Sequence, residues 1–85
     1  MMNLNSVIER LNRLGYRKST GRSFTDEGLP IIDFRKGNKG MTMYSAYLNE
    51  YDSVEYVEKT RLRWNEAQRK YVPVTEKIHR LEQII

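Results

Sequence analysis

The chain has 85 residues, of which 39% are hydrophobic and 31% are charged, a balance typical of one globular domain rather than of a disordered chain. It holds no cysteine, which excludes a disulfide scaffold, a thiolate metal site and a cysteine nucleophile. The chain has no apolar run near the roughly 20 residues that span a bilayer, and its first residues lack the apolar core of a secretory signal. We therefore expect a single cytoplasmic domain over residues 1–85, without contact with a membrane.

The net charge of +4 is unevenly distributed along the chain. Residues 1–22 carry five basic and one acidic side chain, residues 23–58 three basic and seven acidic, and residues 59–85 seven basic and three acidic. Two basic ends therefore flank an acidic middle. Such clustering indicates nucleic-acid binding more strongly than the total charge does.

The first predicted element is a helix that ends before Gly15. Apolar residues at three- and four-residue steps form one stripe on it: Leu4, Val7, Ile8, Leu11 and Leu14. Gly15 stands where a glycine with positive φ ends a helix, and Tyr16 is placed to fold back on Leu11 in a Schellman motif.

Residues 17–30 are polar, contain two glycines and a proline, and predict a long loop that is either mobile or functional. A β-hairpin is expected next, with strand residues Ile31, Ile32 and Phe34, a Gly-Asn-Lys-Gly turn at residues 37–40 and a return strand over residues 41–48. Polar residues at 49–53 predict a second turn.

Residues 53–72 fit a helix and a pair of strands about equally well. As strands, one face carries Val54, Tyr56, Thr60, Leu62 and Trp64, which we expect to be buried, and the other carries Glu55, Lys59, Arg61 and Arg63, which we expect to face solvent. The sequences "TRLRW" and "YVPV" are rich in β-favouring residues, Pro73 suits an edge strand, and residues 65–68 suit a turn. These features favour strands.

The last predicted element is a helix capped by Thr75, with Ile78, Leu81 and Ile85 on one face. The predicted fold is therefore α+β: a helix, a four-stranded antiparallel meander and a second helix, with both helices on the same face of the sheet. In the alternative, residues 53–72 are helical and the fold is mostly α with one β-hairpin.

Catalytic and cofactor chemistry find little support in the sequence. The one histidine, His79, has no serine or carboxylate placed to form a triad with it, and a single histidine without cysteine argues against zinc. Residues 18–23, "KSTGRS", suit an anion-binding nest but lack the spacing of a phosphate loop. We therefore expect no enzyme activity, no metal and no cofactor, with a small basic ribonuclease as the weakest alternative.

The leading hypothesis is a binding module for nucleic acid or for a nucleic-acid-binding protein. Basic side chains on one face of the predicted sheet can follow a sugar–phosphate backbone, and others near the end of the first helix can extend that surface. The predicted nucleic-acid-binding residues are Lys59, Arg61, Arg63, Arg69, Lys70, Arg13, Arg17 and Lys18. Small sheets also keep Lys and Arg outside for solubility, which is the plain alternative.

The second hypothesis is an accessory protein of the phage or mobile-element type, which binds and inhibits a host or defence protein. Residues 43–59 combine four tyrosines with four carboxylates, and Tyr44 and Tyr47 fall on opposite faces of one strand, so some tyrosines must be exposed. Exposed tyrosine is a common interface anchor. The predicted protein-interface residues are Tyr47, Glu50, Tyr51, Asp52, Glu55 and Glu58. A homodimer is compatible with either hypothesis.

Overall fold

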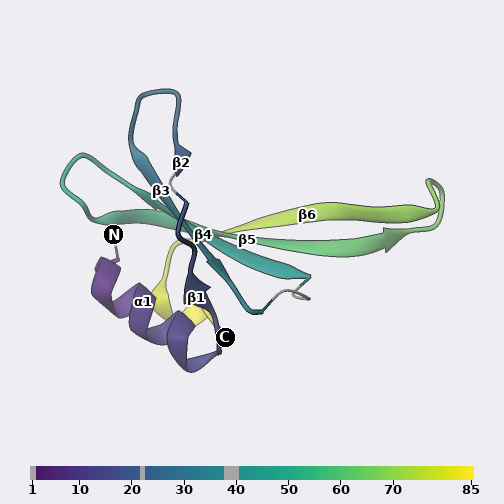
Figure 1. The fold of residues 1–85 in the computed structure, drawn as a ribbon, viewed down its shortest axis with the longest axis horizontal. Helices are drawn as coiled ribbons and strands as arrows, with labels where there is room; N and C mark the ends of the chain where they lie inside the picture. The colour runs from purple at the N-terminus through teal and green to yellow at the C-terminus, as the bar shows by residue number, and fades with distance from the viewer. Residues whose placement is uncertain (1, 22, 38–40) are drawn as a thin grey trace.

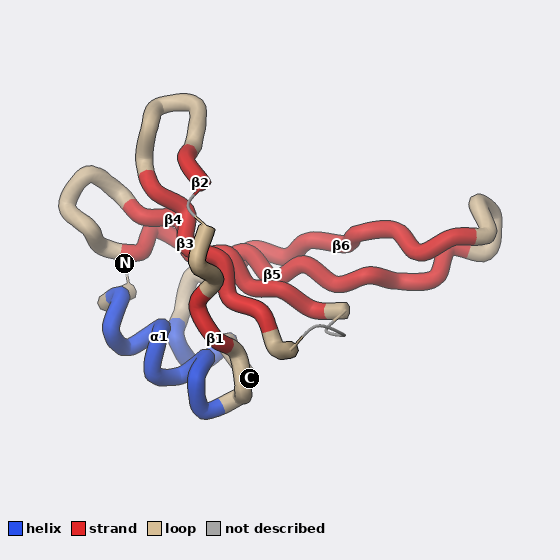
Figure 2. The backbone as a smooth tube through the Cα atoms, in the orientation of Figure 1, coloured by secondary structure: helices blue, strands red, loops and turns tan. Residues whose placement is uncertain are grey.

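In the computed structural model, which describes residues 2–21, 23–37 and 41–85, an α-helix packs against one face of an antiparallel sheet (Figures 1 and 2). The elements are α1 (Leu4–Arg13), β1 (Arg17–Lys18), β2 (Ser23–Phe24), β3 (Pro30–Arg35), β4 (Thr42–Leu48), β5 (Val54–Asn65), β6 (Lys70–Ile78) and a 3-10 turn η1 (Leu81–Gln83). The strand order is β1-β3-β4-β5-β6, and β2 pairs with the same edge of β3 as β1 does. The predicted α+β class and the strand interpretation of residues 53–72 are confirmed, and the helical alternative is wrong.

Local hydrogen bonds define both ends of α1. The side chain of Asn3 caps its start by accepting a bond from the Ser6 amide at 3.2 Å. At its end the Tyr16 amide donates to the Leu11 carbonyl at 2.9 Å, and Gly15 has a φ of +94°. This is the predicted Schellman motif, and it requires the conformational freedom of glycine at this position.

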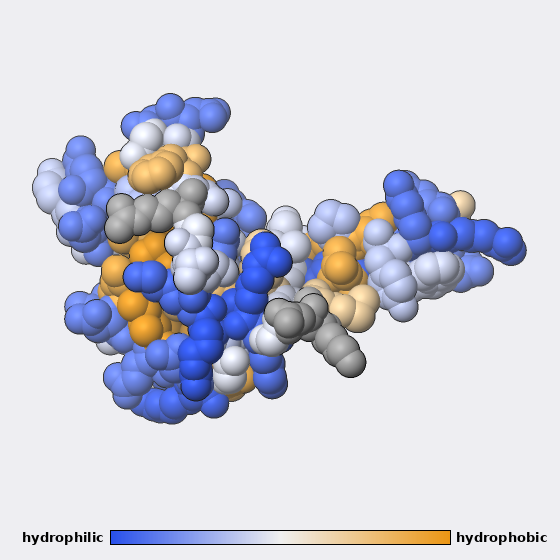
Figure 3. Space-filling view, viewed as in Figure 1, coloured by the Kyte–Doolittle hydropathy of each residue, from blue (hydrophilic) through white to orange (hydrophobic). Residues whose placement is uncertain are grey.

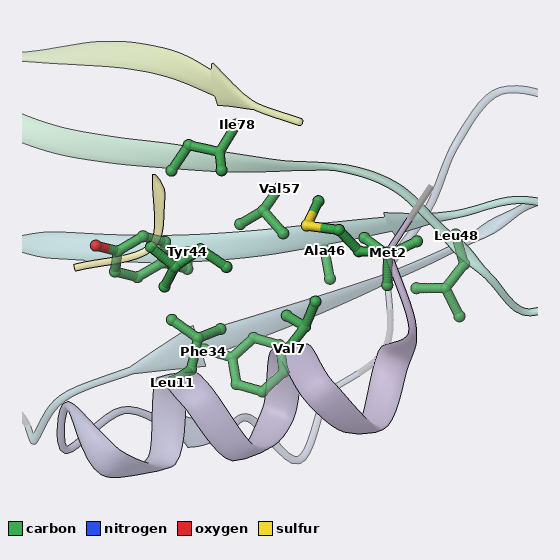
Figure 4. Close-up of a cluster of buried hydrophobic side chains, with 11 residues drawn as sticks. Met2, Val7, Leu11, Phe34, Tyr44, Ala46, Leu48, Val57 and Ile78 are labelled. Carbon is green, nitrogen blue, oxygen red and sulfur yellow. The ribbon is translucent and has the colours of Figure 1, made fainter. Parts of the chain in front are cut away.

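The hydrophobic core lies between α1 and the sheet (Figure 4). Its buried members are Met2, Val7, Leu11, Phe34, Tyr44, Ala46, Leu48, Val54, Val57, Ile78 and Ile84. The C-terminal segment closes this core beside α1, where Ile84 is buried and the Tyr44 hydroxyl donates to the Ile85 carbonyl at 3.5 Å. The strands β3 to β6 each contribute to this layer, so the sheet and the helix depend on one another for burial.

A β-bulge near the start of β5 decides which face of this strand is buried. Leu48 pairs with Val54, but the preceding residue of β4, Tyr47, pairs with Tyr56, so Glu55 has no partner in β4. Because the bulge inserts one residue, the buried positions of β5 switch from even to odd numbers after it. Alternation in the sequence does not reveal this switch.

Two predicted elements are wrong. Residues 75–78 belong to β6, in which Thr75 pairs with Thr60 and Ile78 with Val57, and the expected C-terminal helix is reduced to η1. Pairing with the long strand β5 satisfies the backbone of these residues, which outweighs a short helical pattern. The predicted loop over residues 17–30 contributes β1 and β2 to the edge of β3, so four strands are too few. The predicted turn at 37–40 falls mainly on residues 38–40, which lie outside the described residues.

Candidate nucleic-acid interface

The outer part of the β5–β6 hairpin extends beyond the rest of the sheet as a two-stranded arm (Figures 1 and 2). The last residue pair between β4 and β5 is Thr42–Arg61, whereas β5 and β6 stay paired as far as Asn65–Lys70. We define the arm as residues 62–73. Ten of these twelve residues are exposed and none is buried. Neither face of the arm is therefore covered by another layer of the fold.

A tight turn closes the arm at residues 66–69. The side chain of Asn65 accepts a hydrogen bond from the Gln68 amide at 3.0 Å, and Arg69 has a φ of 51°. Positive φ is uncommon for a residue other than glycine and is concentrated in turns. The turn predicted over residues 65–68 is thus confirmed to within one residue, and it places Arg69 at the tip of the arm.

Cations occupy one face of the arm and its tip. On β5, Arg61 lies opposite Val74 and Arg63 lies opposite Val72, and Lys70 lies on the same face of β6. This face continues the side of the sheet on which α1 packs. We call the following four residues, three in the arm and Arg61 at its base, the arm cations: Arg61, Arg63, Arg69 and Lys70.

The arm cations have no carboxylate partner within the described part of the chain. The ion pair found there joins Glu9 and Arg13 on α1. The carboxylate of the arm itself, Glu66, instead accepts a hydrogen bond from the Trp64 indole at 2.6 Å. The positive charge of the arm is therefore available to an external anion, such as a phosphate group.

The face of β5 that carries the cations in the arm is the face that is buried nearer the core. This contradicts the expectation that the cations lie on the solvent face of the whole strand and the apolar residues on the buried face. Val57 is fully buried under α1, and Lys59, Arg61 and Arg63 follow it on the same face. The cations reach solvent only because β5 continues beyond the core.

Three large side chains of β5 that we expected to be buried, Tyr56, Leu62 and Trp64, lie on the opposite face, which α1 does not cover. Tyr56 is half-buried there, and Leu62 and Trp64 are 43% and 53% exposed. This second surface of the arm was not predicted from the sequence. One available signal was the position of Trp64 and Tyr71, which lie at equal distances from the turn at residues 66–69 and are therefore cross-strand partners.

Lys59, the innermost predicted cation, does not belong to the arm. Its ammonium lies 5.6 Å from the ring centroid of Tyr44, and Lys59 is paired across the strands with Tyr44 and Glu76. Burial, with a smaller contribution from nearby Tyr16, raises the pKa of the Tyr44 hydroxyl. Lys59 therefore continues the row of Arg61 and Arg63 inward on the same face of β5, over the Tyr44 ring.

The three predicted outlying cations lie at the other edge of the sheet. β1 and β5 are separated by β3 and β4, which amounts to about 14 Å at the usual strand spacing. Arg13 is paired with Glu9, and the Arg17 guanidinium donates to the Asn12 carbonyl at 2.9 Å. Lys18 follows on β1. The structure therefore does not bring Arg13, Arg17 and Lys18 together with the arm cations.

Most of the predicted acidic, tyrosine-rich surface is at the β4–β5 turn, the end of β5 opposite to the arm. The Asn49 side chain organises this turn by accepting bonds from the Tyr51 and Ser53 amides at 2.9 and 3.1 Å. Tyr51 is 77% exposed. The neighbouring exposed carboxylates are Glu50, Asp52 and Glu55.

The other two predicted members of that surface, Tyr47 and Glu58, lie on the uncovered sheet face. The Tyr47 ring stacks on Tyr56 with centroids 4.6 Å apart, and its hydroxyl is 3.5 Å from the Glu58 carboxylate. Burial, and then the charge of Glu58, raises the pKa of Tyr47. Asp33 lies on the same face and accepts a bond from Ser45 at 2.7 Å. The middle of this face therefore carries the carboxylates of Asp33 and Glu58, with Lys77 opposite Glu58 and its ammonium 4.7 Å from the Tyr56 ring centroid.

Catalytic groups do not gather in the described part of the chain. His79 lies just after β6 and not on a helix, with its ring centroid 6.1 Å from that of Tyr56. Residues 2–21, 23–37 and 41–85 contain no cluster of three His, Cys, Asp or Glu side chains that could hold a metal ion. Of the predicted anion-binding stretch, residues 18–21 line a hollow together with Phe24, Pro30 and Ile32. Apolar walls of this kind do not suit a phosphate group.

Comparisons of the chain with protein families, with curated proteins and with solved structures gave no match. Among the described residues, no helix is long and apolar enough to cross a membrane. The function is therefore inferred from the geometry of the chain itself.

Proposed function

We propose that this protein is a non-enzymatic nucleic-acid-binding module that contacts phosphate groups with the arm cations Arg61, Arg63, Arg69 and Lys70. The observation that carries the proposal is the concentration of these four cations, which have no ion-pair partner among the described residues, on the projecting arm and at its base, where Arg61 lies. A two-stranded ribbon of this kind is narrow enough to approach a nucleic-acid backbone or groove without interference from the rest of the domain.

The distribution of charge limits the contact to the arm. The uncovered sheet face carries Asp33 and Glu58, with the cation Lys77 opposite Glu58, and the β4–β5 turn carries three further carboxylates, Glu50, Asp52 and Glu55. A nucleic acid laid along the whole sheet would approach these groups and be repelled. We therefore expect few phosphate contacts, weak sequence preference and micromolar affinity at low salt.

The number of cations sets the expected salt dependence. Each neutralised phosphate contributes about 0.7 to the slope of log affinity against log salt for a single strand and about 0.9 for a duplex. Four contacts give a slope of about −2.8 to −3.6, so affinity falls about 50- to 150-fold between about 50 and 200 mM salt. With two contacts the fall is only about 7- to 12-fold.

Fluorescence anisotropy with labelled random oligonucleotides across this salt range tests the proposal. Replacing two cations together, Arg61→Ala with Arg63→Ala, should weaken binding and halve the salt slope. The matched control is Arg17→Ala with Lys18→Ala, which removes the same charge at the distant edge of the sheet and should leave the slope unchanged. A wild-type slope shallower than about −1, or an unchanged slope in the arm variant, would refute the assignment.

A separate observation favours a second function, the capture of a basic protein. Tyr51 is 77% exposed in a turn that also presents Glu50, Asp52 and Glu55, and a large amphipathic ring among carboxylates suits a cationic surface such as the nucleic-acid groove of a host protein. The variant Tyr51→Ala with Asp52→Asn should abolish capture of such a partner without unfolding the domain. Asn is used because it tolerates the φ of 61° at position 52. Capture that survives both substitutions would exclude this surface.

A further inference from the structure

The second face of the arm is aromatic and apolar and has no role in the core. Trp64 and Tyr71 are direct cross-strand partners with ring centroids 5.3 Å apart and an interplanar angle of 72°. They are 53% and 55% exposed. Leu62 and Pro73, the next pair inward, extend the same face. Figure 3 shows hydrophobic residues on the arm between the rest of the domain and the hydrophilic tip. We call these four residues the aromatic face.

Resting on the proposed function, we infer that the nucleic acid is single-stranded, with unpaired bases stacked on Trp64 and Tyr71 while the arm cations hold the phosphates. Every base has an aromatic surface that stacks on such rings, and each stacked base contributes about 1–3 kcal/mol. Bases in a duplex are already stacked on one another, so the rings gain this contact only where bases are unpaired.

The polar groups of the aromatic face argue against readout of a duplex. Sequence is read in a groove by hydrogen bonds to base edges. The Trp64 indole already donates to Glu66 at 2.6 Å, which leaves the Tyr71 hydroxyl as the side-chain polar group of this face. Glu66 also fixes the orientation of the indole ring. A face of this composition stacks with bases and does not read their edges.

The arm can contact both the bases and the phosphates of one nucleic-acid strand because it is only two β-strands wide. Neighbouring β-strands lie about 4.8 Å apart, so the ribbon is narrow. At its edges the aromatic face and the cationic face are separated by little more than the width of the backbone. Arg69 lies at the tip, where the two faces meet, and Lys70, which points to the cationic face, directly precedes Tyr71 in β6. Phosphates that pass around the tip or the edge of the arm therefore meet positive charge.

The area of the aromatic face argues against a second copy of the chain as its occupant. A large aromatic side chain buries about 150–250 Å² when it is fully covered, and both rings are already about half covered here. With Leu62, each copy offers on the order of 300 Å², so a symmetric dimer would bury on the order of 600 Å² of this surface. Stable specific interfaces bury at least about 1,200 Å².

Trp64 is the one tryptophan of the chain, so its fluorescence reports directly on the proposed contact. The full chain is titrated at about 50 mM salt, where phosphate contacts are strong, with a mixed-sequence DNA strand and with the duplex of the same sequence. We expect at least about tenfold tighter binding to the single strand, together with quenching of Trp64 emission that the duplex does not cause.

Substitutions separate stacking from charge. Tyr71→Ala should lower single-strand affinity by about 5- to 150-fold without changing the salt slope, because it removes a stacked ring and no cation. Tyr71→Phe keeps the ring and should retain the affinity. The control Tyr51→Ala removes an exposed tyrosine at the opposite end of β5 and should have no effect.

Each outcome decides between defined alternatives. Equal affinity for the duplex with unchanged Trp64 emission overturns the inference, while the salt slope of the arginine variant still supports the proposed function. Absence of binding to either nucleic acid overturns both. A change of Trp64 emission with protein concentration alone, together with a concentration-dependent mass in sedimentation, would assign the aromatic face to a second copy and overturn the inference.

Discussion

Deletion of the arm should leave the rest of the domain folded. Arg61 and Val74 are direct cross-strand partners, so residues 62–73 can be replaced by Asn-Gly, a sequence suited to the two-residue turn of a β-hairpin. The shortened β5–β6 hairpin keeps every pair from Arg61–Val74 to Val57–Ile78, and all buried residues remain.

The expected change in the free energy of unfolding is less than about 1 kcal/mol. A two-stranded ribbon with no covering layer is only marginally stable by itself, and none of the deleted residues is buried. By contrast, truncating a single buried aromatic side chain costs about 3–5 kcal/mol. Because the surface of the arm is already exposed in the folded state, its removal should also change the dependence on denaturant very little.

Urea unfolding followed by far-ultraviolet circular dichroism measures this change without relying on Trp64, which the deletion removes. For a small domain the midpoint should shift by less than about 1 M urea. A loss of more than about 2 kcal/mol, or of the cooperative transition, would show that the arm belongs to the folding unit and would refute the reasoning. If the domain remains folded, the same variant, which keeps only Arg61 of the arm cations, should lose most of its affinity for nucleic acid. This result would separate the binding element from the folded scaffold.

Three further predictions concern the core and the end of α1. Gly15→Ala should destabilise the domain by about 1–2 kcal/mol, because alanine is strained at a φ of +94° and its Cβ would lie 3.1 Å from Lys36 Cε. The control is Gly21→Ala, where an added Cβ meets nothing within 4 Å, and it should be nearly neutral in the same urea measurement. Phe34→Ala should lower the free energy of unfolding by about 3–5 kcal/mol, enough to leave much of so small a domain unfolded by circular dichroism at 25 °C. Burial raises the pKa of Tyr44, so its contribution to stability is complete below the unfolded value of about 10 and is lost as pH rises from there through the folded pKa. Tyr44→Phe should therefore flatten the alkaline fall of stability by about 1.4 kcal/mol per pH unit in unfolding curves recorded above pH 10, and an unchanged fall would contradict this cause.

Local sequence determined the elements whose hydrogen bonds are made within a few residues. The apolar stripe of α1 and the glycine at its end predicted that helix and its Schellman motif. The turn residues at 49–53 and 65–68 predicted the points at which the chain reverses. β-favouring residues correctly indicated strands over 53–72. In each case the physical cause lies in side-chain periodicity or backbone conformation, which neighbouring residues set.

Tertiary structure alone decided which face of β5 is buried and where β5 leaves the core. Alternation in a strand defines two faces but does not show which of them meets the helix. The bulge at Glu55 inserts one residue and therefore exchanges the buried and the exposed face along β5. Likewise, the helical pattern after Thr75 yields to β6 because the long strand β5 offers a partner for its backbone. The cations of the arm were predicted from the sequence, whereas the exposure of Trp64 and Tyr71 was not, because it depends on the absence of a covering layer beyond the last pair of β4 and β5.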